Sequence, residues 1–434
     1  MHRENTLFRR LKTVPFWRDD FPRPADLPVS SLPEQVDVAI VGGGYTGLSA
    51  ARTLSRGGAR VVVLEQSKIG YGASSVNGGQ VGPGLKAGMQ TVLKRYGPEL
   101  GRELWQASLK GVKFLEQTIA DERIDCDYTG RGGLALAFRP SHYKRMVDLV
   151  KWMAHELNYE QKIIPPEKLR QEIGSDAYYG AILEEEGGGI HPAKYVYGLA
   201  CAAARAGAML CEDTTVQRIG RRARRTDFQL ATSFGELDAG QVLLATNGYT
   251  GPLVPDIQRR VFPVGSYMIT TEPLSLELQR ELSPNDRVFY DTKHFLNYFR
   301  LTPDGRMSMG GRNNLSPDLD LVESARNLQR RMVEIFPQLR HVPVTHSWTG
   351  RLGLTFDLVP HIGRIGGVYY ALGYGGHGVA LSNYLGKEVA ELIAGQISHS
   401  PFAEISHQTY FFYKRKPWFL PAAAAYYRFL DAIR

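Results

Sequence analysis

A strand, a glycine-rich turn, a helix and a second strand follow one another near the start of the chain. Residues 36–41 form a β-branched apolar run, which is typical of a buried parallel strand. The turn at 42–47 reads Gly-Gly-Gly-Tyr-Thr-Gly, residues 48–58 carry a helical apolar stripe, and 60–65 repeat the strand pattern. Two parallel strands joined by a helix over about 30 residues make a βαβ unit. The sequence therefore predicts an α/β fold with a parallel sheet.

The glycines and the acidic residue of this unit have the spacing of a dinucleotide site. Gly42 permits the tight turn, Gly44 leaves room for a pyrophosphate beside the backbone, and Gly47 lets the helix approach the strand. The helix N-terminus offers free N–H groups to the phosphates. Glu65 ends the second strand about 20 residues after the turn, where a carboxylate accepts hydrogen bonds from a ribose diol. These features predict an adenine dinucleotide without a 2′-phosphate.

Three later stretches favour FAD over NAD. Residues 70–80 form a loop of small residues, 245–248 end a strand in a turn, and 373–378 form a glycine turn that opens the last helix of the pattern. A second helix N-terminus suits the pyrimidine edge of a flavin, because reduction places negative charge there. We predict that the FAD-binding residues are Gly42, Gly44, Tyr45, Thr46, Gly47, Glu65, Gln66, Ser74, Ser75, Asn77, Gly78, Gly79, Gln80, Val216, Thr246, Asn247, Gly248, Gly350, Gly353, Gly375, Gly376, His377, Gly378 and Val379.

With these motifs, the sequence resembles the D-amino-acid-oxidase-like (DAO) superfamily of FAD-dependent oxidoreductases. The resemblance rests on residues 38–65, 70–80, 187–192, 244–249, 298–312 and 349–395, which cover most of the chain. Within the superfamily, residues 73–80, 348–350 and 357–360 are most similar to γ-glutamylputrescine oxidoreductases. Those relatives usually carry Arg where Val76 stands, and this departure concerns the choice of substrate.

The resemblance implies a Rossmann-like FAD-binding domain of the glutathione-reductase type, interleaved with an antiparallel-sheet substrate domain (α/β with an α+β insert). We assign 36–105, 188–255 and 349–400 to the FAD domain and 106–187 and 256–348 to the substrate domain. Residues 1–35 are predicted to be an extended arm lying over the surface, and 401–434 to be an aromatic, basic tail. A helical pattern is expected from 84 to about 121.

The implied reaction is oxidation of a C–N bond in an amine or amino acid, such as a γ-glutamylpolyamine or a cyclic or N-substituted amino acid. A hydride passes to flavin N5, the imine is hydrolysed, and oxygen, a quinone or an electron carrier accepts the electrons. Two alternatives stay open at this point. One is C–OH oxidation of a hydroxy acid or glycerol phosphate, and the other is a flavin-carrying subunit of a larger complex.

Hydride transfer from an amine needs few side chains beyond those that bind and orient the substrate. His377, in the last glycine turn, is the first candidate beside the flavin, the alternative being a simple helix cap. The aromatic candidates for the substrate wall are Tyr267, Tyr298 and Trp348, which are otherwise core residues. Arg300 and Arg312 are candidates for holding a carboxylate, or else surface arginines at strand ends. Lys293, His294 and Asn297 are candidates for an oxygen-activating base.

Composition limits the other classes of function. Cys126, Cys201 and Cys211 have no metal-ligand spacing and lie far from the region where some relatives attach FAD covalently, so we expect noncovalent FAD and no metal site. The net charge is +8, but the arginines at 218–225 lack interleaved aromatic residues and predict a solvated hairpin rather than a nucleic-acid surface. The first 35 residues lack the apolar segment of a signal peptide, so we expect a cytoplasmic protein. The tail is expected to pack on its own domain, with a membrane or subunit contact as the alternative.

Overall fold

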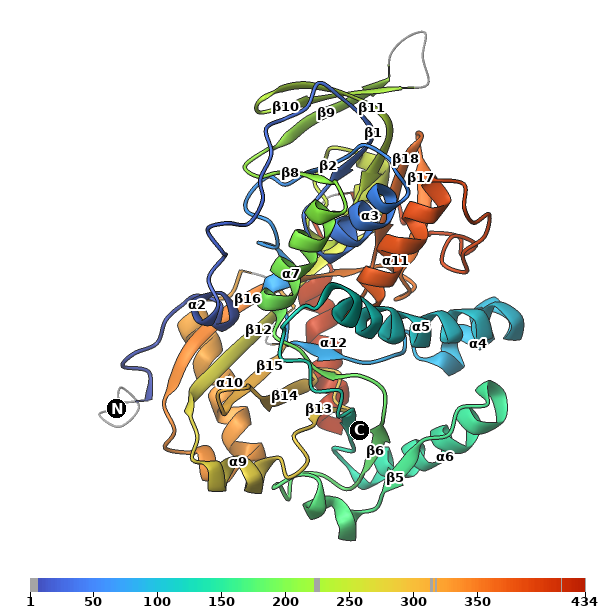
Figure 1. Ribbon diagram of the computed structural model, residues 1–434. Coiled ribbons are helices and arrows are strands. Elements are labelled where there is room, and N and C mark those ends of the chain that lie inside the picture. Colours follow the sequence, from blue (N-terminus) through green and yellow to red (C-terminus); the bar gives the residue numbers. More distant parts are fainter. Residues whose placement is uncertain (1–6, 222–226, 313–314, 317, 415, 434) are drawn as a thin grey trace.

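The computed structural model describes residues 7–221, 227–312, 315–316, 318–414 and 416–433. Two eight-stranded sheets and a two-stranded one organise this part of the chain, and Figure 1 shows the two large sheets one above the other. The upper sheet has the order β17-β18-β11-β1-β2-β8, with β10 and β9 added to β11. Its strands are β1 (Gln35–Val41), β2 (Val61–Leu64), β8 (Met209–Cys211), β9 (Val216–Arg221), β10 (Phe228–Thr232), β11 (Gly235–Leu244), β17 (His361–Ile365) and β18 (Val368–Leu372).

The central strands of the upper sheet run parallel. β1 pairs in parallel with β2 and β11, and β11 pairs in parallel with β18. Every residue of β2 is buried, as expected for a strand covered on both faces. The predicted βαβ unit is therefore present, with α3 (Tyr45–Arg56) as its crossover helix.

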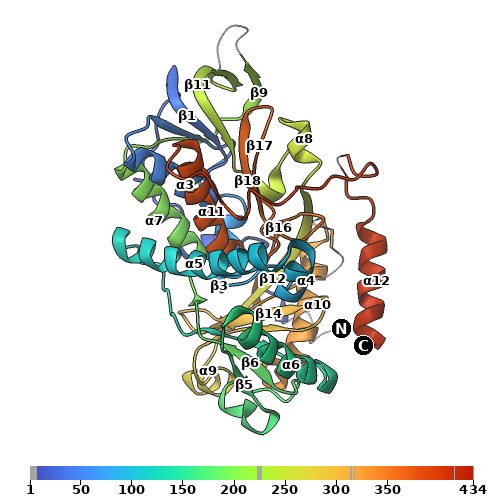
Figure 2. The same cartoon turned by 90° about the vertical axis from the view of Figure 1, so that its right-hand side faces the viewer.

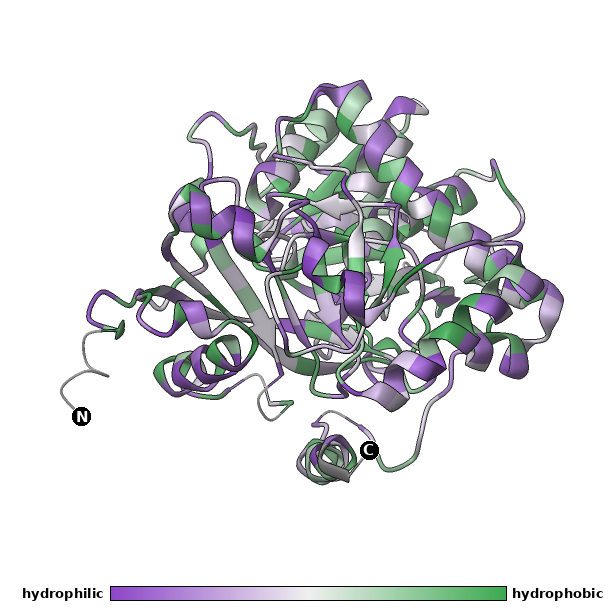
Figure 3. Ribbon diagram, turned by 90° about the horizontal axis from the view of Figure 1, so that it is seen from below, coloured by the Kyte–Doolittle hydropathy of each residue, from purple (hydrophilic) through white to green (hydrophobic). Residues whose placement is uncertain are grey.

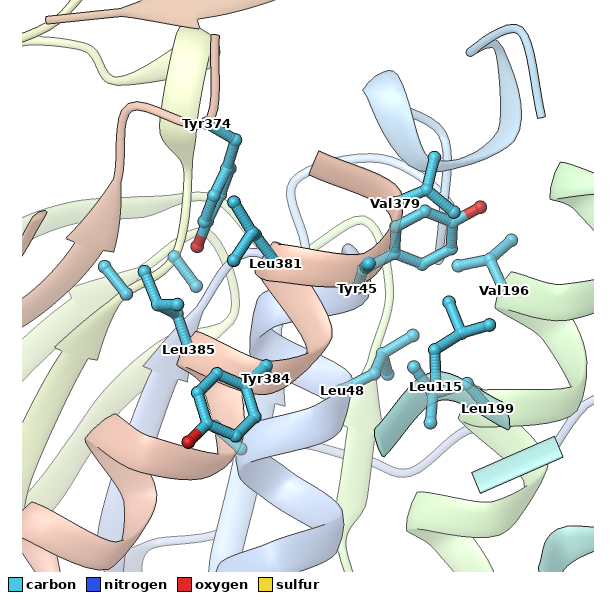
Figure 4. Packing of buried hydrophobic residues seen from close by; sticks show 14 of the residues in the cluster. Tyr45, Leu48, Leu115, Val196, Leu199, Tyr374, Val379, Leu381, Tyr384 and Leu385 are labelled. Carbon is cyan, nitrogen blue, oxygen red and sulfur yellow. The ribbon is translucent and has the colours of Figure 1, made fainter. Parts of the chain in front are cut away.

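Four helices pack together over one face of this sheet: α3, α5 (Pro98–Glu122), α7 (Pro192–Arg205) and α11 (Gly378–Ile393). Figure 4 shows Leu48 of α3 between Leu199 of α7 and the side chains of α11. Gly386 allows α11 to approach α3 closely, because a Cβ there would lie 2.5 Å from the Thr46 carbonyl oxygen. This packing fixes the N-termini of α3 and α11 relative to each other.

The lower sheet has the order β16-β12-β15-β14-β13-β4-β6-β5 and is antiparallel except between β13 and β4. Its strands are β4 (Gly133–Leu136), β5 (Lys162–Ile164), β6 (Ala181–Glu184), β12 (Phe262–Pro273), β13 (Val288–Asp291), β14 (Asn297–Leu301), β15 (Arg306–Gly311) and β16 (Val344–Leu354). Its strands come from two separate stretches of the chain. The proposed domain boundary between 348 and 349 falls inside β16.

The remaining elements connect and cover the sheets. The small third sheet pairs β3 (Gln80–Val81) with β7 (Gly188–Gly189). Among the residues described, no helix is both long and apolar enough to cross a membrane. The other helices are α2 (Phe16–Asp20), α4 (Met89–Tyr96), α6 (Pro140–Leu157), α8 (Pro255–Gln258), α9 (Leu276–Leu282), α10 (Leu321–Ile335) and α12 (Leu420–Ile433), with short 3-10 turns at Ala73–Ser75, Pro166–Gln171, Asn247–Tyr249 and Pro337–Leu339.

Two expectations about elements were wrong in detail. The N-terminal arm does not lie over the surface throughout: most of its described residues are exposed or half-buried, but Phe16 and Trp17 of α2 are buried, and the Trp17 indole N–H donates to the Asn77 carbonyl oxygen at 2.8 Å. The helical stretch after residue 84 is two helices, α4 and α5. They are separated at Gly97, whose φ of 86° interrupts the helical backbone.

Candidate functional site

A cavity of about 630 Å³ opens at the carboxyl ends of the parallel strands in the upper sheet. Its lining includes Gly42 after β1, Glu65 after β2 and Ala245 after β11. Ligands of open α/β sheets bind at this edge, because the loops that follow neighbouring parallel strands meet there. The volume is within the usual range for a pocket that holds a small molecule or cofactor.

The first glycine turn, residues 42–47, exposes backbone to the cavity on one side and packs closely against neighbouring backbone on the other. Gly42 has a φ of 112°, and a Cβ there would lie 2.9 Å from the Ala245 carbonyl oxygen. Gly44 is the N-cap of α3, and the Tyr45 N–H donates to the Ser74 hydroxyl at 3.0 Å. A Cβ on Gly47 would lie 2.0 Å from the Gly42 carbonyl oxygen. The turn thus needs glycine for its φ and for helix–strand contact, while the N-terminus of α3 faces the cavity.

Glu65 supplies a carboxylate at the far side of this turn. Its two oxygens accept the N–H groups of Gly43 at 2.8 Å and Ser67 at 3.0 Å. Burial raises the pKa of Glu65, and these two hydrogen bonds oppose that rise by favouring the charged form. The carboxylate therefore has a fixed orientation and further lone pairs for the hydroxyl groups of a ribose.

The opposite end of the cavity is built around the N-terminus of α11. Gly375, Gly376 and Gly378 line it, and the Tyr374 hydroxyl lies 2.7 Å from the Thr46 hydroxyl of α3. Asn247, held at a φ of 42°, accepts the Gly373 N–H through its side-chain oxygen at 2.9 Å. Two helix N-termini and a carboxylate thus surround one elongated space, a donor and acceptor set that suits a dinucleotide.

The cavity brings together most, but not all, of the residues predicted to bind FAD. Those that line it are Gly42, Gly44, Tyr45, Thr46, Glu65, Gln66, Ser74, Asn77, Val216, Thr246, Asn247, Gly353, Gly375, Gly376, Gly378 and Val379. The others lie outside its lining: Gly47, Ser75, Gly78, Gly79, Gln80, Gly248, Gly350 and His377. Several of these are packing positions, as at Gly248, where a Cβ would lie 2.9 Å from the Gly353 nitrogen.

Sequence reasoning missed other residues of the cavity wall. Tyr249 and Arg351 both line it, and the Arg351 guanidinium lies 5.7 Å from the centre of the Tyr249 ring. Arg218 also lines it, so this member of the basic hairpin is not merely solvated. Arg222, Arg224 and Arg225 lie outside the described residues. The segment after β8 could have pointed to Arg218, because it follows the carboxyl end of a parallel strand and its residues 214–219 all line the cavity.

His377 lies within the last glycine turn, half-buried at the N-cap position of α11. Its side chain makes no capping hydrogen bond, which argues against the simple capping role, and its buried Nδ1 has no hydrogen-bond partner among the described residues. Burial, together with the positive charge of Lys86, lowers the pKa of His377 to about 4. The ring is therefore neutral at neutral pH.

Lys86 is a second residue that the sequence did not single out. A Cβ added to Gly375 would lie 2.9 Å from the Cβ of Lys86, so the Lys86 side chain starts beside the glycine turn. Burial lowers the pKa of Lys86 to about 7, and the positive charge of Arg312 adds to the effect. No ion pair to either cation is found within the described part of the chain. Lys86 and Arg312 are therefore a pair of half-buried cations, near enough for the charge of Arg312 to affect Lys86, without a balancing carboxylate there.

Tyr298 lies next to this pair. Its hydroxyl is 2.9 Å from the Ser266 hydroxyl, and burial raises the pKa of Tyr298 while the positive charge of Arg312 opposes that rise. A Cβ on Gly78 would lie 2.7 Å from the Tyr298 ring, so the small-residue loop leaves room for this aromatic side chain. Arg312 and Tyr298 thus stay candidates for the substrate side.

The other predicted substrate residues are held by structural contacts. Tyr267 is fully buried, and its hydroxyl donates to the Ser316 carbonyl oxygen at 2.7 Å. The Trp348 indole N–H donates to the carbonyl oxygen of buried Val76 at 2.8 Å. Arg300 is not a surface residue: it is buried and donates to the Ile190 carbonyl oxygen at 2.9 Å. The buried contacts of these residues favour a core role for each of them.

The three candidates for an oxygen-activating base also have partners elsewhere. The Lys293 ammonium lies 3.6 Å from the centre of the Phe138 ring, and the His294 ring stacks on Tyr427 at 5.2 Å. The Asn297 amide donates to the buried Asp291 carboxylate at 2.7 Å. None of the three lines the cavity. Within the described residues no cluster of side chains suits a metal ion.

Comparison with known proteins agrees with this geometry. The DAO family, described as FAD dependent oxidoreductase, matches residues 37–392. The chain is 36% identical to γ-glutamylputrescine oxidoreductase of Escherichia coli (strain K12), over 88% of this chain and 89% of the relative. It is 32% identical to the probable oxidoreductase OrdL of Haemophilus influenzae, over 83% and 84% respectively. Its fold is similar to that of glycine oxidase from Geobacillus kaustophilus, with a TM-score of 0.74 and 22% identity over 87% and 100% of the two chains. The chain therefore belongs to the DAO family of FAD-dependent oxidoreductases, and its cofactor is FAD.

Proposed function

We propose that this enzyme oxidises the C–N bond of an amine or amino acid that carries a carboxylate. A γ-glutamylpolyamine and a cyclic or N-substituted amino acid both fit this description. A relative named γ-glutamylputrescine oxidoreductase and a fold neighbour named glycine oxidase support the choice of C–N chemistry. When bound, FAD supplies the oxidising group, which takes a hydride from the carbon next to the nitrogen.

The observation that supports a carboxylate is the cation pair of Lys86 and Arg312. Arg312 is half-buried, and burial lowers its pKa as it does that of Lys86. A buried cation is stable when an anion accompanies it, so an unbalanced pair favours an anionic ligand. Arginine can hold a carboxylate with two parallel hydrogen bonds. Free polyamines carry only positive charge and would be repelled.

Two side chains at this position, His377 and Lys86, differ in their protonation at neutral pH. His377, with a pKa of about 4, adds no positive charge at neutral pH. Lys86, with a pKa of about 7, exists there in both protonation states, so its Nζ is able to hold a proton that leaves a substrate ammonium. The amine must lose that proton before its neighbouring carbon gives up hydride. Water then hydrolyses the imine.

The electron acceptor and the place of the reaction are further parts of the proposal. We propose oxygen, a quinone or an electron carrier as the acceptor, and a cytoplasmic location. We also propose that the residues lining the cavity contact FAD, and that the FAD-binding and substrate domains are interleaved along the chain.

The test is anaerobic bleaching of the FAD-loaded protein by paired substrates that differ in one group. γ-Glutamylputrescine, N-methyl amino acids and cyclic imino acids carry a carboxylate, whereas putrescine and other polyamines do not. We expect loss of the visible flavin colour with at least one carboxylate-bearing amine and none with free polyamines. Bleaching by hydroxy acids alone, with no amine released, would establish the C–OH alternative instead.

Arg312→Gln tests the role of the cation pair. We expect the substrate concentration for half-maximal bleaching to rise about 30-fold, because removing one partner of a half-buried charge pair costs about 2 kcal/mol, the lower end of the range for buried pairs. Arg326→Gln, at an exposed position of α10, is the matched control and should behave as the unmodified protein. Equal behaviour of the two variants would exclude Arg312 from substrate binding.

A further inference from the structure

The C-terminal tail presents an unusual number of aromatic side chains to solvent. Phe411 is 91% exposed, Trp418 67%, Phe429 60% and Tyr426 59%. Tyr410, Phe412 and Tyr427 are also exposed. Large apolar residues that are exposed singly are common, but a group of them along one segment marks a contact surface.

The tail is held in place on its inner side, so this exposure is not that of a loose end. Leu420 and Ala424 of α12 pack with Phe262 and Phe295 in a buried cluster. The Asp431 carboxylate accepts the N–H groups of His294 at 2.8 Å and Phe295 at 2.9 Å. These contacts fix which face of α12 points outward.

The outward face of α12 is apolar as well. Ala422, Ala425, Tyr426 and Phe429 are exposed and have the spacing of one helical stripe. A helix this rich in apolar residues is normally buried, yet α12 stands at the outer edge of the molecule in Figures 2 and 3. The turn before it adds a second aromatic group, in which the Trp418 indole N–H donates to the Phe412 carbonyl oxygen at 3.0 Å.

The charge of the segment selects the kind of partner. From residue 405 to the end the chain has five Lys or Arg residues and a single acidic residue, Asp431, which is turned inward. Lys414, Lys416 and Arg428 are exposed among the aromatic residues. Two copies of such a face would bring like charges together, whereas an anionic surface would neutralise them. Aromatic and basic residues side by side are characteristic of helices that lie in the headgroup layer of a membrane.

We propose that the tail surface, formed by Tyr410, Phe411, Phe412, Lys414, Lys416, Trp418, Tyr426 and Phe429, binds an anionic lipid bilayer. The aromatic rings enter the headgroup layer, and the lysines lie beside lipid phosphates. The protein is then attached at the surface without spanning the membrane. Such attachment would bring the enzyme close to quinones dissolved in the lipid.

The experiment is sedimentation of the FAD-loaded, full-length protein with sucrose-filled vesicles. One set contains phosphatidylglycerol in phosphatidylcholine, and the other contains phosphatidylcholine alone. We expect binding to the anionic set that weakens with added salt, and much weaker binding to the neutral set. Absence of binding to anionic vesicles, or equal binding to both, would overturn the proposal.

Variants localise the contact. The double variant Phe411→Ser with Trp418→Ser should lower the vesicle partition coefficient at least about tenfold. The double variant Lys414→Gln with Lys416→Gln should lower it about tenfold. Phe234→Ser is the matched control, because Phe234 is 66% exposed in the turn between β10 and β11. An unchanged flavin spectrum and melting temperature show that each variant is folded. Two outcomes would contradict the proposal. One is vesicle binding that the tail variants leave unchanged. The other is a dimer of the protein, formed without lipid, that Phe411→Ser with Trp418→Ser dissociates. Turnover is not measured, so the outcome is independent of the proposed reaction.

Discussion

Lys86 shows how one residue couples the fold to pH. Its pKa is about 7 in the folded protein, below the usual value for lysine, because burial and the charge of Arg312 disfavour its protonated form. The unfolded chain therefore binds more protons than the folded protein between about pH 7 and about pH 10. The stability contribution of Lys86 rises as the pH rises through this window.

Lys86→Met should remove that pH dependence. Between about pH 7 and about pH 9.5 the free energy of unfolding should increase more in the unmodified protein than in the variant. We expect a difference of about 1 to 3 kcal/mol, since one pKa unit corresponds to about 1.4 kcal/mol and partial exposure reduces the effect. Urea unfolding at the two pH values measures it. Lys110→Met, at an exposed position of α5, should keep the original slope. Parallel pH profiles for the unmodified protein and Lys86→Met would disprove this account.

At the scale of elements, the five-residue helix α2 contributes two buried aromatic side chains to the core. Trp17→Ala removes a fully buried indole and its 2.8 Å hydrogen bond to the Asn77 carbonyl oxygen, in the loop that borders the cavity. We expect a loss of about 3 to 5 kcal/mol in stability and weaker retention of FAD. Thermal unfolding and flavin loss on gel filtration measure the two effects. Trp418→Ala, which truncates an exposed Trp, should change neither; equal effects of the two variants would refute the assignment.

Local pattern explains which elements could be predicted from the sequence. The unit β1–α3–β2 was predicted because its strands are short apolar runs and its turn is a contiguous glycine motif. The position of α2 was not, because the burial of Phe16 and Trp17 needs partners distant in sequence, such as His346 and His191. The break between α4 and α5 is marked by Gly97 and by Pro98, which begins α5; the helical apolar pattern alone does not reveal it.

At the scale of the whole molecule, the cavity is assembled from stretches that lie far apart in the chain. Contiguous motifs such as 42–47 and 373–378 identified much of its wall in advance. The contact of Lys86 with Gly375 could not be predicted, because it arises only when the segment after β3 is placed beside the turn before α11. The dispersed lining has a further consequence: a ligand bound there adds contacts between segments that lie far apart in the chain.

FAD should therefore stabilise the whole protein without a covalent bond. The three cysteines all lie within the described residues and none lines the cavity, and burial raises the pKa of Cys126 to about 12 and of Cys211 to about 11, which disfavours their thiolates. Acid precipitation should leave the flavin in the supernatant. The melting temperature of the apoprotein should rise with added FAD, because a ligand at 100 times its Kd adds about 2.7 kcal/mol to stability. Flavin that stays with the precipitate, or a melting temperature independent of FAD, would contradict a noncovalent cofactor bound across these segments.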